Sequence, residues 1–178
     1  MADKRGAGRA VAIVTATLCC MAIVVWWLCW RPVTTLLIVR HAERLGSQDQ
    51  LSEAGLTRAE ELLHVAAEVS LAAIYTSDTN RARQTAKPLA SALGLTPVVL
   101  PAEPATTLVT HIFVNHRGRT VLVVGHSNTV PQIISAAGGP TLANLPEDEF
   151  DRLFVLETCR CRWGRSKLIN LQYGATSP

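Results

Sequence analysis

The sequence predicts an α/β domain in which a mostly parallel sheet carries helices on both faces, preceded by an apolar segment near the N-terminus. Short apolar runs alternate with longer amphipathic segments, which implies right-handed crossovers between parallel strands. The run Thr120–Gly125 (TVLVVG) is apolar at every position but its first, as expected of a strand that is buried on both faces. Residues 31–178 number 148, which is enough for one well-buried domain and too few for two.

Strands are expected where short apolar runs are bounded by polar or turn-forming residues. The first run begins after Pro32, and the last two flank the segment Cys159–Lys167, which predicts a hairpin at the end of the chain. The expected strands are Thr34–Arg40, Leu71–Ser77, Pro97–Leu100, Thr120–Gly125, Asp151–Glu157 and Leu168–Tyr173.

Helix boundaries follow from capping residues and helix breakers. Thr57-Arg58-Ala59-Glu60 is a capping-box pattern, in which a hydroxyl and a carboxylate bind free backbone amides at the start of a helix. Gly94 ends the next helix, which Pro88 is expected to kink. Asn128 is expected to cap the last helix, with Pro131 in its first turn. The expected helices are about Thr57–Val69, Asp78 or Thr79–Leu93, Thr106–His116 and Val130–Ala137.

The N-terminal segment from Ala10 to Trp30 holds 21 consecutive uncharged residues. A helix of that length reaches roughly 31 Å, which matches the hydrocarbon core of a bilayer. We therefore expect a basic head over residues 1–9, a transmembrane signal anchor over 10–30 and the main domain over 31–178. A cleaved signal peptide is the alternative, but Trp27–Trp30 stands where cleavage needs small residues. The basic head favours a single-pass membrane protein with an exported, extracytoplasmic domain.

Composition excludes several classes of protein. The chain has 17 basic and 14 acidic residues, and its first 30 residues hold three basic residues against one acidic residue. The remainder is therefore nearly neutral and lacks the concentrated basic surface of a nucleic-acid binder.

Three of the five cysteines lie in the expected membrane span. Cys159 and Cys161 are too close in sequence for an unstrained disulfide, and they lack the further ligands that a zinc site needs.

Polar side chains follow three of the expected strands at the point where each strand ends. Arg40-His41 follows the first strand, Ser77–Arg81 follows the second, and His126–Asn128 follows the most hydrophobic strand. Ligands of open α/β sheets bind outside the carboxyl ends of the strands. We therefore expect two histidines and two arginines to meet at one edge of the sheet.

This set of side chains suits phosphoryl transfer. The guanidinium groups of Arg40 and Arg81 match the oxygens of a phosphoryl group. A neutral imidazole is a competent nucleophile at phosphorus, and the nearby positive charges should lower the pKa of His41. His126 would add a further donor if bound phosphate protonates it. Free amides at the start of the Asn128 helix would favour the same anion.

Each residue also has a simpler interpretation. Arg40 and His41 alone could end a strand at the surface, and Arg81 alone could lie on a solvated helix face. His41, Glu43 and His126 could form a two-histidine, one-carboxylate metal site. The two neighbouring arginines disfavour a divalent cation at that place, so we expect no metal and no cofactor.

Four segments that carry these residues resemble the histidine phosphatase superfamily, in its phosphoglycerate-mutase-like family. The resemblance runs from about Thr34 to Tyr173 and implies a three-layer αβα sandwich that needs no metal. It also implies that His41 is the nucleophile that becomes phosphohistidine, within a phosphate pocket of Arg40, His41, Arg81 and His126. The segments are LLIVRHAE, LSEAGLTRAEEL, IYTSDTNRARQTA and VLVVGHSNTV.

The same resemblance implies a carboxylic acid that protonates the leaving oxygen. The segment Gly94–Arg119 contains one acid, Glu103, which is the candidate general acid. Small members of the superfamily that lack an evident acid act on good leaving groups such as phosphohistidine, and they are the alternative. The acid-phosphatase branch has an aspartate after its second histidine, where this chain has Ser127. Glu43 is expected to orient the loop that follows the nucleophile.

The chain is therefore expected to be a phosphatase that hydrolyses phosphomonoesters, or phosphohistidine, through a covalent phosphohistidine on His41. Hydrolysis is favoured over mutase chemistry because so short a chain leaves little room for a large lid. A membrane-tethered phosphate-binding or scaffold domain with weak catalysis is the alternative. The expected partners are a phosphorylated substrate and the membrane. Specificity is expected to lie in Arg44–Gln50, Pro101–Thr107 and Thr141–Glu149, and the oligomeric state stays open.

Overall fold

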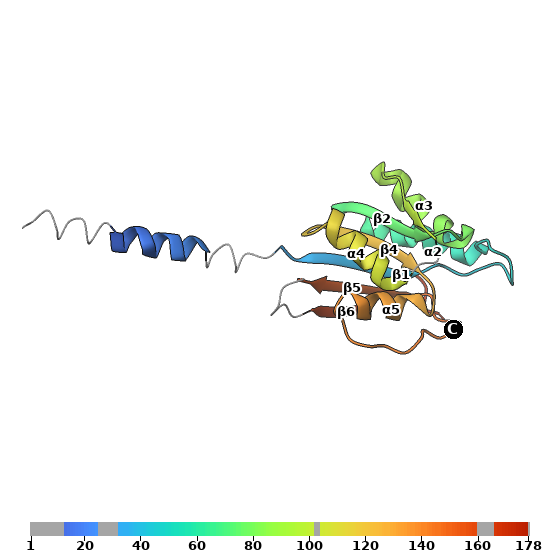
Figure 1. Ribbon diagram of the computed structural model, residues 1–178. Helices are drawn as coiled ribbons and strands as arrows, with labels where there is room; N and C mark the ends of the chain where they lie inside the picture. Colours follow the sequence, from blue (N-terminus) through green and yellow to red (C-terminus); the bar gives the residue numbers. More distant parts are fainter. Residues whose placement is uncertain (1–12, 25–31, 102–103, 160–165, 178) are drawn as a thin grey trace, which may run out of the picture. The chain divides into compact units, whose positions relative to one another are not determined.

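The computed structural model describes residues 13–24, 32–101, 104–159 and 166–177 (Figure 1). The chain divides into two compact units, Met1–Arg31 and Pro32–Pro178. In the first unit, residues 13–24 form a helix whose side chains are exposed.

The membrane span predicted over residues 10–30 is not found in the described part of the chain. No helix among the described residues is both long enough and apolar enough to cross a bilayer. The helix over residues 13–24 covers only the middle of the predicted span, and the rest of it lies outside the described residues. The predicted basic head, residues 1–9, lies outside them as well.

The second unit contains a six-stranded sheet in the order β3-β2-β4-β1-β5-β6. The pairs β1·β4, β2·β4 and β2·β3 are parallel, whereas β5 runs antiparallel to both β1 and β6. This confirms the mostly parallel sheet and the hairpin at the end of the chain. The strands are β1 Thr34–Arg40, β2 Leu71–Ser77, β3 Val98–Leu100, β4 Thr120–Gly125, β5 Arg152–Thr158 and β6 Lys167–Gln172.

Helices cover both faces of this sheet, as predicted (Figure 1). On β1, Leu36 and Ile38 belong to the core beneath α4 and α5, whereas Leu37 and Val39 belong to the core beneath α2 and α3. Because strand side chains alternate between faces, a run that is apolar at every position is buried on both. The helices are α2 Glu53–Ala66, α3 Asn80–Leu93, α4 Ala105–Asn115 and α5 Thr129–Ala136.

Two of the predicted helix starts need correction. Helix α2 begins at Glu53, one turn before the predicted capping box, because the Ser52 side chain accepts a hydrogen bond from the Gly55 amide. The Thr57 hydroxyl instead donates to the Glu53 carbonyl within the helix. Asn128 occupies the N-cap position of α5 as predicted, but its side chain makes no capping hydrogen bond.

The boundaries of α3 agree with prediction at both ends. The Thr79 side chain accepts from the Ala82 amide, and Gly94 ends the helix in the left-handed conformation with φ 64°. Glycine adopts this conformation without steric cost. Pro88 lies inside the helix. The carboxyl end of β2 therefore leads into a helix that is capped at both ends, and Arg81 is in its first turn.

Candidate active site

The register between β1 and β4 brings the two predicted site histidines together. Arg40 pairs with Gly125 at the end of the two strands, and the His41 amide donates to the Gly125 carbonyl at 2.9 Å. The next residue on each strand is therefore a histidine. The rings of His41 and His126 lie edge to face, with centroids 5.2 Å apart. Gly125 is required here, because an added Cβ would lie 2.8 Å from the Thr129 hydroxyl oxygen.

The His41 imidazole is held in a neutral form that leaves one nitrogen free to react. Its Nδ1 lies 2.7 Å from the carbonyl oxygen of Ala42. Because a carbonyl only accepts, Nδ1 carries the hydrogen and Nε2 carries the lone pair. Burial, with smaller contributions from the charges of His126, Arg81 and Arg40, lowers the pKa of His41 to about 4. The direction agrees with prediction, but burial contributes more than the arginines do.

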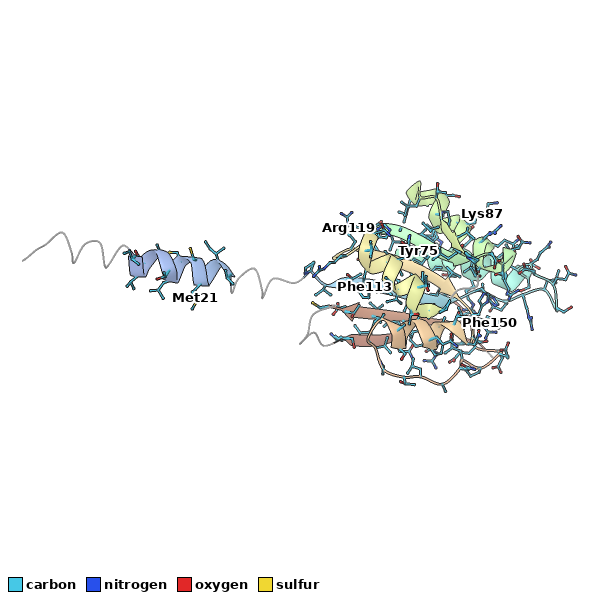
Figure 2. All side chains as sticks on the ribbon, in the orientation of Figure 1. Met21, Tyr75, Lys87, Phe113, Arg119 and Phe150 are labelled. Atoms are coloured by element: carbon cyan, nitrogen blue, oxygen red, sulfur yellow. The ribbon has the colours of Figure 1, made fainter. Side chains whose placement is uncertain are left out.

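Arg40 is almost fully buried, with 3% of its surface exposed. Its Nη1 donates to the carbonyls of Pro146 at 2.6 Å and Glu149 at 3.0 Å, and its Nη2 donates to the Glu147 carboxylate at 3.1 Å. The guanidinium carbon lies 4.1 Å from the centre of the Phe150 ring, which is cation–π distance. Figure 2 labels Phe150 in this region. One loop thus fixes the orientation of Arg40.

Arg81 stands in the first turn of α3 and is held by the loop after β1. Its Nη1 donates to Asp49 at 2.9 Å, and the same carboxylate accepts from the amides of Asn80 and Arg81. A carboxylate at a helix N-terminus is favourable for the helix dipole. The charge of Arg81 contributes to the lowered pKa of both His41 and His126.

Both arginines present an unused donor at this place. Among the described residues, the Nε atoms of Arg40 and Arg81 are buried and have no hydrogen-bond partner. A buried donor without a partner costs about 1–3 kcal/mol of stability. Their remaining hydrogen bonds go to loop carbonyls and to the exposed carboxylates of Glu147 and Asp49. Each guanidinium is thus held through its terminal nitrogens, while its Nε–H lacks an acceptor among the described residues.

His126 is held by the strand and helix on either side of it. Its Nε2 lies 2.9 Å from the Ser77 hydroxyl at the end of β2, and its amide donates to the Thr129 hydroxyl. Burial lowers the pKa of His126, and the charges of Arg81 and Arg40 act in the same direction. One expectation is corrected. The amides of Thr129 and Val130 donate to the His126 carbonyl and are not free for an anion.

Glu43 holds the loop after His41 through contacts with α2 and its N-cap. Its carboxylate accepts three hydrogen bonds of 2.6–2.9 Å from Arg58, which is 5% exposed. Arg58 also donates to the carbonyls of Tyr173 and Ala175. The Glu43 carboxylate is thus bound by a guanidinium, and the metal alternative with the two histidines gains no support. Glu103, the candidate general acid, lies outside the described residues.

Sequence reasoning missed the residues that position the two arginines. Asp49 and Glu147 lie in loops that the sequence marked only as specificity regions, and Phe150 was not considered. Glu147 also accepts a hydrogen bond from Ser127 at 2.9 Å. The one signal in the sequence that could have identified these partners is the presence of acidic residues in the loops expected near two arginines. Arg40 and Glu147 are 107 residues apart in the sequence. Only the tertiary structure shows that they are in contact.

The family comparison covers the first part of the domain. A sequence model of the histidine phosphatase superfamily (branch 1) matches residues 36–103. This segment includes Arg40, His41 and Arg81, and it ends before His126. No curated protein matches the chain.

Solved structures extend the likeness over most of the domain. A candidate phosphohistidine phosphatase SixA from Agrobacterium tumefaciens is 27% identical, with a TM-score of 0.56 over 80% of this chain and 97% of its own. A mycobacterial glucosyl-3-phosphoglycerate phosphatase is 18% identical, with a TM-score of 0.59 over 79% and 99%. The protein histidine phosphatase SixA, in a complex with tungstate, is 15% identical, with a TM-score of 0.61 over 78% of this chain and 96% of its own. The chain therefore shares its fold with these phosphatases, and its residues 36–103 match the model of the histidine phosphatase superfamily.

Proposed function

We propose that this chain is a phosphatase that hydrolyses phosphomonoesters, or phosphohistidine, through a covalent phosphohistidine on His41. The observation that carries the proposal is that Arg40 and Arg81 each hold a buried Nε–H with no partner among the described residues, while His41 is a neutral imidazole whose Nε2 carries the lone pair. A phosphoryl group accepts hydrogen bonds from guanidinium groups and is attacked by such a nitrogen.

The reaction proceeds in two steps. Nε2 of His41 attacks phosphorus, an N–P bond forms, and the bond to the leaving oxygen or nitrogen breaks, with a proton transferred to the leaving group. Water then attacks the phosphohistidine and gives a proton back to the group that protonated the leaving group. The O–P bond forms, the N–P bond breaks, and inorganic phosphate leaves while Nε2 recovers its lone pair. Arg40, Arg81 and His126 stabilise the charge on the transferred phosphoryl oxygens.

Glu103 remains our candidate for the proton donor to the leaving group. The proposal rests on the sequence resemblance alone. Replacing Glu103 with glutamine should slow the hydrolysis of alkyl phosphates strongly, because an alkoxide is a poor leaving group that needs a proton. Hydrolysis of p-nitrophenyl phosphate should slow far less, because its leaving group needs little protonation. Equal slowing of both substrates would remove Glu103 from this role.

The activities named for the similar proteins support the proposed class of reaction. The mycobacterial relative is named a glucosyl-3-phosphoglycerate phosphatase and SixA a protein histidine phosphatase. Both names describe removal of a phosphoryl group, although from different substrates. The alternative function is a phosphate-binding or scaffold domain with weak turnover, which the same anion site would also serve.

The test is turnover of p-nitrophenyl phosphate by the full chain and by His41→Ala. His64→Ala is the matched control, because His64 is exposed on α2 and away from the strand ends. We expect His41→Ala to lose at least a thousandfold in kcat while it still binds phosphate, and His64→Ala to keep full activity. Phosphate binding with equally low turnover in all three proteins would favour the scaffold alternative.

We also propose, from the uncharged stretch over residues 10–30, that the chain is anchored in a membrane with its domain exported. The test is fractionation of cells that express the full chain, followed by protease treatment of intact cells or spheroplasts. Recovery of the chain in the fraction free of membranes, at its full length, would refute the anchor.

A further inference from the structure

A cavity of about 190 Å³ adjoins His126 on the face of the sheet that α4 and α5 cover. Its floor is formed by the sheet, including Tyr75, which Figure 2 labels. Its walls come from the end of β3 and from both helices. The apolar side chains that line it include Tyr75, Leu100, Leu108, Val123 and Ile133.

The cavity borders the proposed anion site at His126. Ser77 and His126, which are joined by a hydrogen bond of 2.9 Å, both line it. Gly125 lies at the same junction and contributes no side chain that would separate the two spaces. A group attached to a phosphoryl unit beside His126 would therefore lie next to the cavity.

The lining of the cavity indicates the chemistry of its occupant. None of the described residues that line it carries a positive charge, and its single charged residue is Asp78, which is exposed. A carboxylate or a second phosphate would therefore find no counter-charge there. A dry apolar cavity of about 150 Å³ accepts a benzene molecule, so this cavity has room for a ring of that size or a short alkyl chain.

We propose that this cavity binds the alcohol portion of the substrate, and that the substrates are phosphomonoesters of neutral aryl or short alkyl alcohols. The inference rests on the proposed function, because it assumes that the phosphoryl group lies between His41, His126 and the two arginines. It goes further by naming the class of leaving group and the surface that selects it.

The test measures binding and does not depend on turnover. Calorimetry on the full chain compares inorganic phosphate with n-alkylphosphonates from methyl to hexyl, in which the P–C bond resists hydrolysis. Each methylene that enters an apolar cavity should tighten binding about fourfold. We expect the dissociation constant to fall at least tenfold between methyl and butyl, and then to level off once the cavity is full.

A charged substitution in the cavity wall supplies the matched comparison. Leu108 is half-buried in the wall on α4, whereas Val114 on the same helix is 73% exposed. Leu108→Lys should abolish the dependence on chain length and leave phosphate binding within about threefold, and Val114→Lys should change neither. Ala105→Leu, a milder change at another lining residue, should make binding level off at a shorter chain.

The outcomes separate this inference from the function on which it rests. Phosphate binding without any dependence on chain length in the unmodified chain would overturn the inference and leave the proposed function standing. Absence of phosphate binding would overturn both. Tighter binding of 3-phosphoglycerate than of butylphosphonate would also overturn the inference, because the cavity lining offers a carboxylate no positive charge.

Discussion

Replacing Arg81 with alanine tests the anion site most directly. Arg81 donates one hydrogen bond from Nη1 to Asp49, and its buried Nε has no partner among the described residues. The substitution removes that donor and a full positive charge from the place where phosphoryl oxygens gain charge in the transition state. Loss of one such donor costs about a hundredfold to a thousandfold in rate, so we expect kcat/KM to fall by at least a hundredfold.

The folded state should tolerate this change. The Arg81 side chain is 23% exposed, and Asp49 would still accept a hydrogen bond from the Asn80 amide at the start of α3. Surface substitutions of this kind change the free energy of unfolding by about 0.5 kcal/mol. Arg81→Lys should recover part of the activity, because lysine restores the charge without the planar pair of donors.

The assay is steady-state hydrolysis of p-nitrophenyl phosphate, with urea unfolding measured on the same samples. Arg83→Ala is the matched control, because Arg83 is exposed two residues further along the same helix. We expect Arg83→Ala to keep activity and stability. A loss of less than tenfold for Arg81→Ala, with Arg83→Ala unchanged, would show that Arg81 does not contact the phosphoryl group.

Three further predictions concern the surroundings of the site. Glu43→Gln should lower the free energy of unfolding by about 3 kcal/mol in urea titrations, because it leaves the buried Arg58 guanidinium without its carboxylate; a loss below 1 kcal/mol would contradict this. The pKa of His41 is lowered from 6.5 to about 4, and the unfolded chain therefore binds the proton first as the pH falls. His41 should thus contribute full stability above pH 6.5 and lose about 3 kcal/mol of it as the pH falls to 4; an equal pH dependence in His41→Ala would refute this. Glu147→Gln should tighten competitive inhibition by phosphate about threefold, because it removes a competing carboxylate while two loop carbonyls still hold Arg40; weaker inhibition would mean that Glu147 is needed to position Arg40.

The strands that carry the site were predictable because their apolar composition indicates that they are buried. Strands β1, β2 and β4 have the predicted bounds, since each is a continuous apolar run ended by polar residues. Parallel strands in one sheet present their carboxyl ends at one edge, so the meeting of His41 and His126 followed from those bounds.

The start of α2 was not predictable from local pattern. The capping-box pattern placed the start at Thr57, whereas Ser52, five residues earlier, caps the helix in the structure. A contact with the preceding loop accompanies the start at Ser52, where the Ser52 amide and hydroxyl both donate to the Glu43 carbonyl. Gly55 permits that approach, because a Cβ at this position would overlap the same oxygen.

Composition and the order of apolar runs determined the α/β architecture, the edge of the sheet that carries the chemistry, and the identity of its two histidines and two arginines. These features depend on periodicity and burial, which neighbouring residues encode. Only the tertiary structure decided how the arginines are oriented, because Asp49 and Glu147 approach them from loops far away in the chain. It alone also revealed the apolar cavity beside His126, since a cavity exists only where the surfaces of separate elements meet.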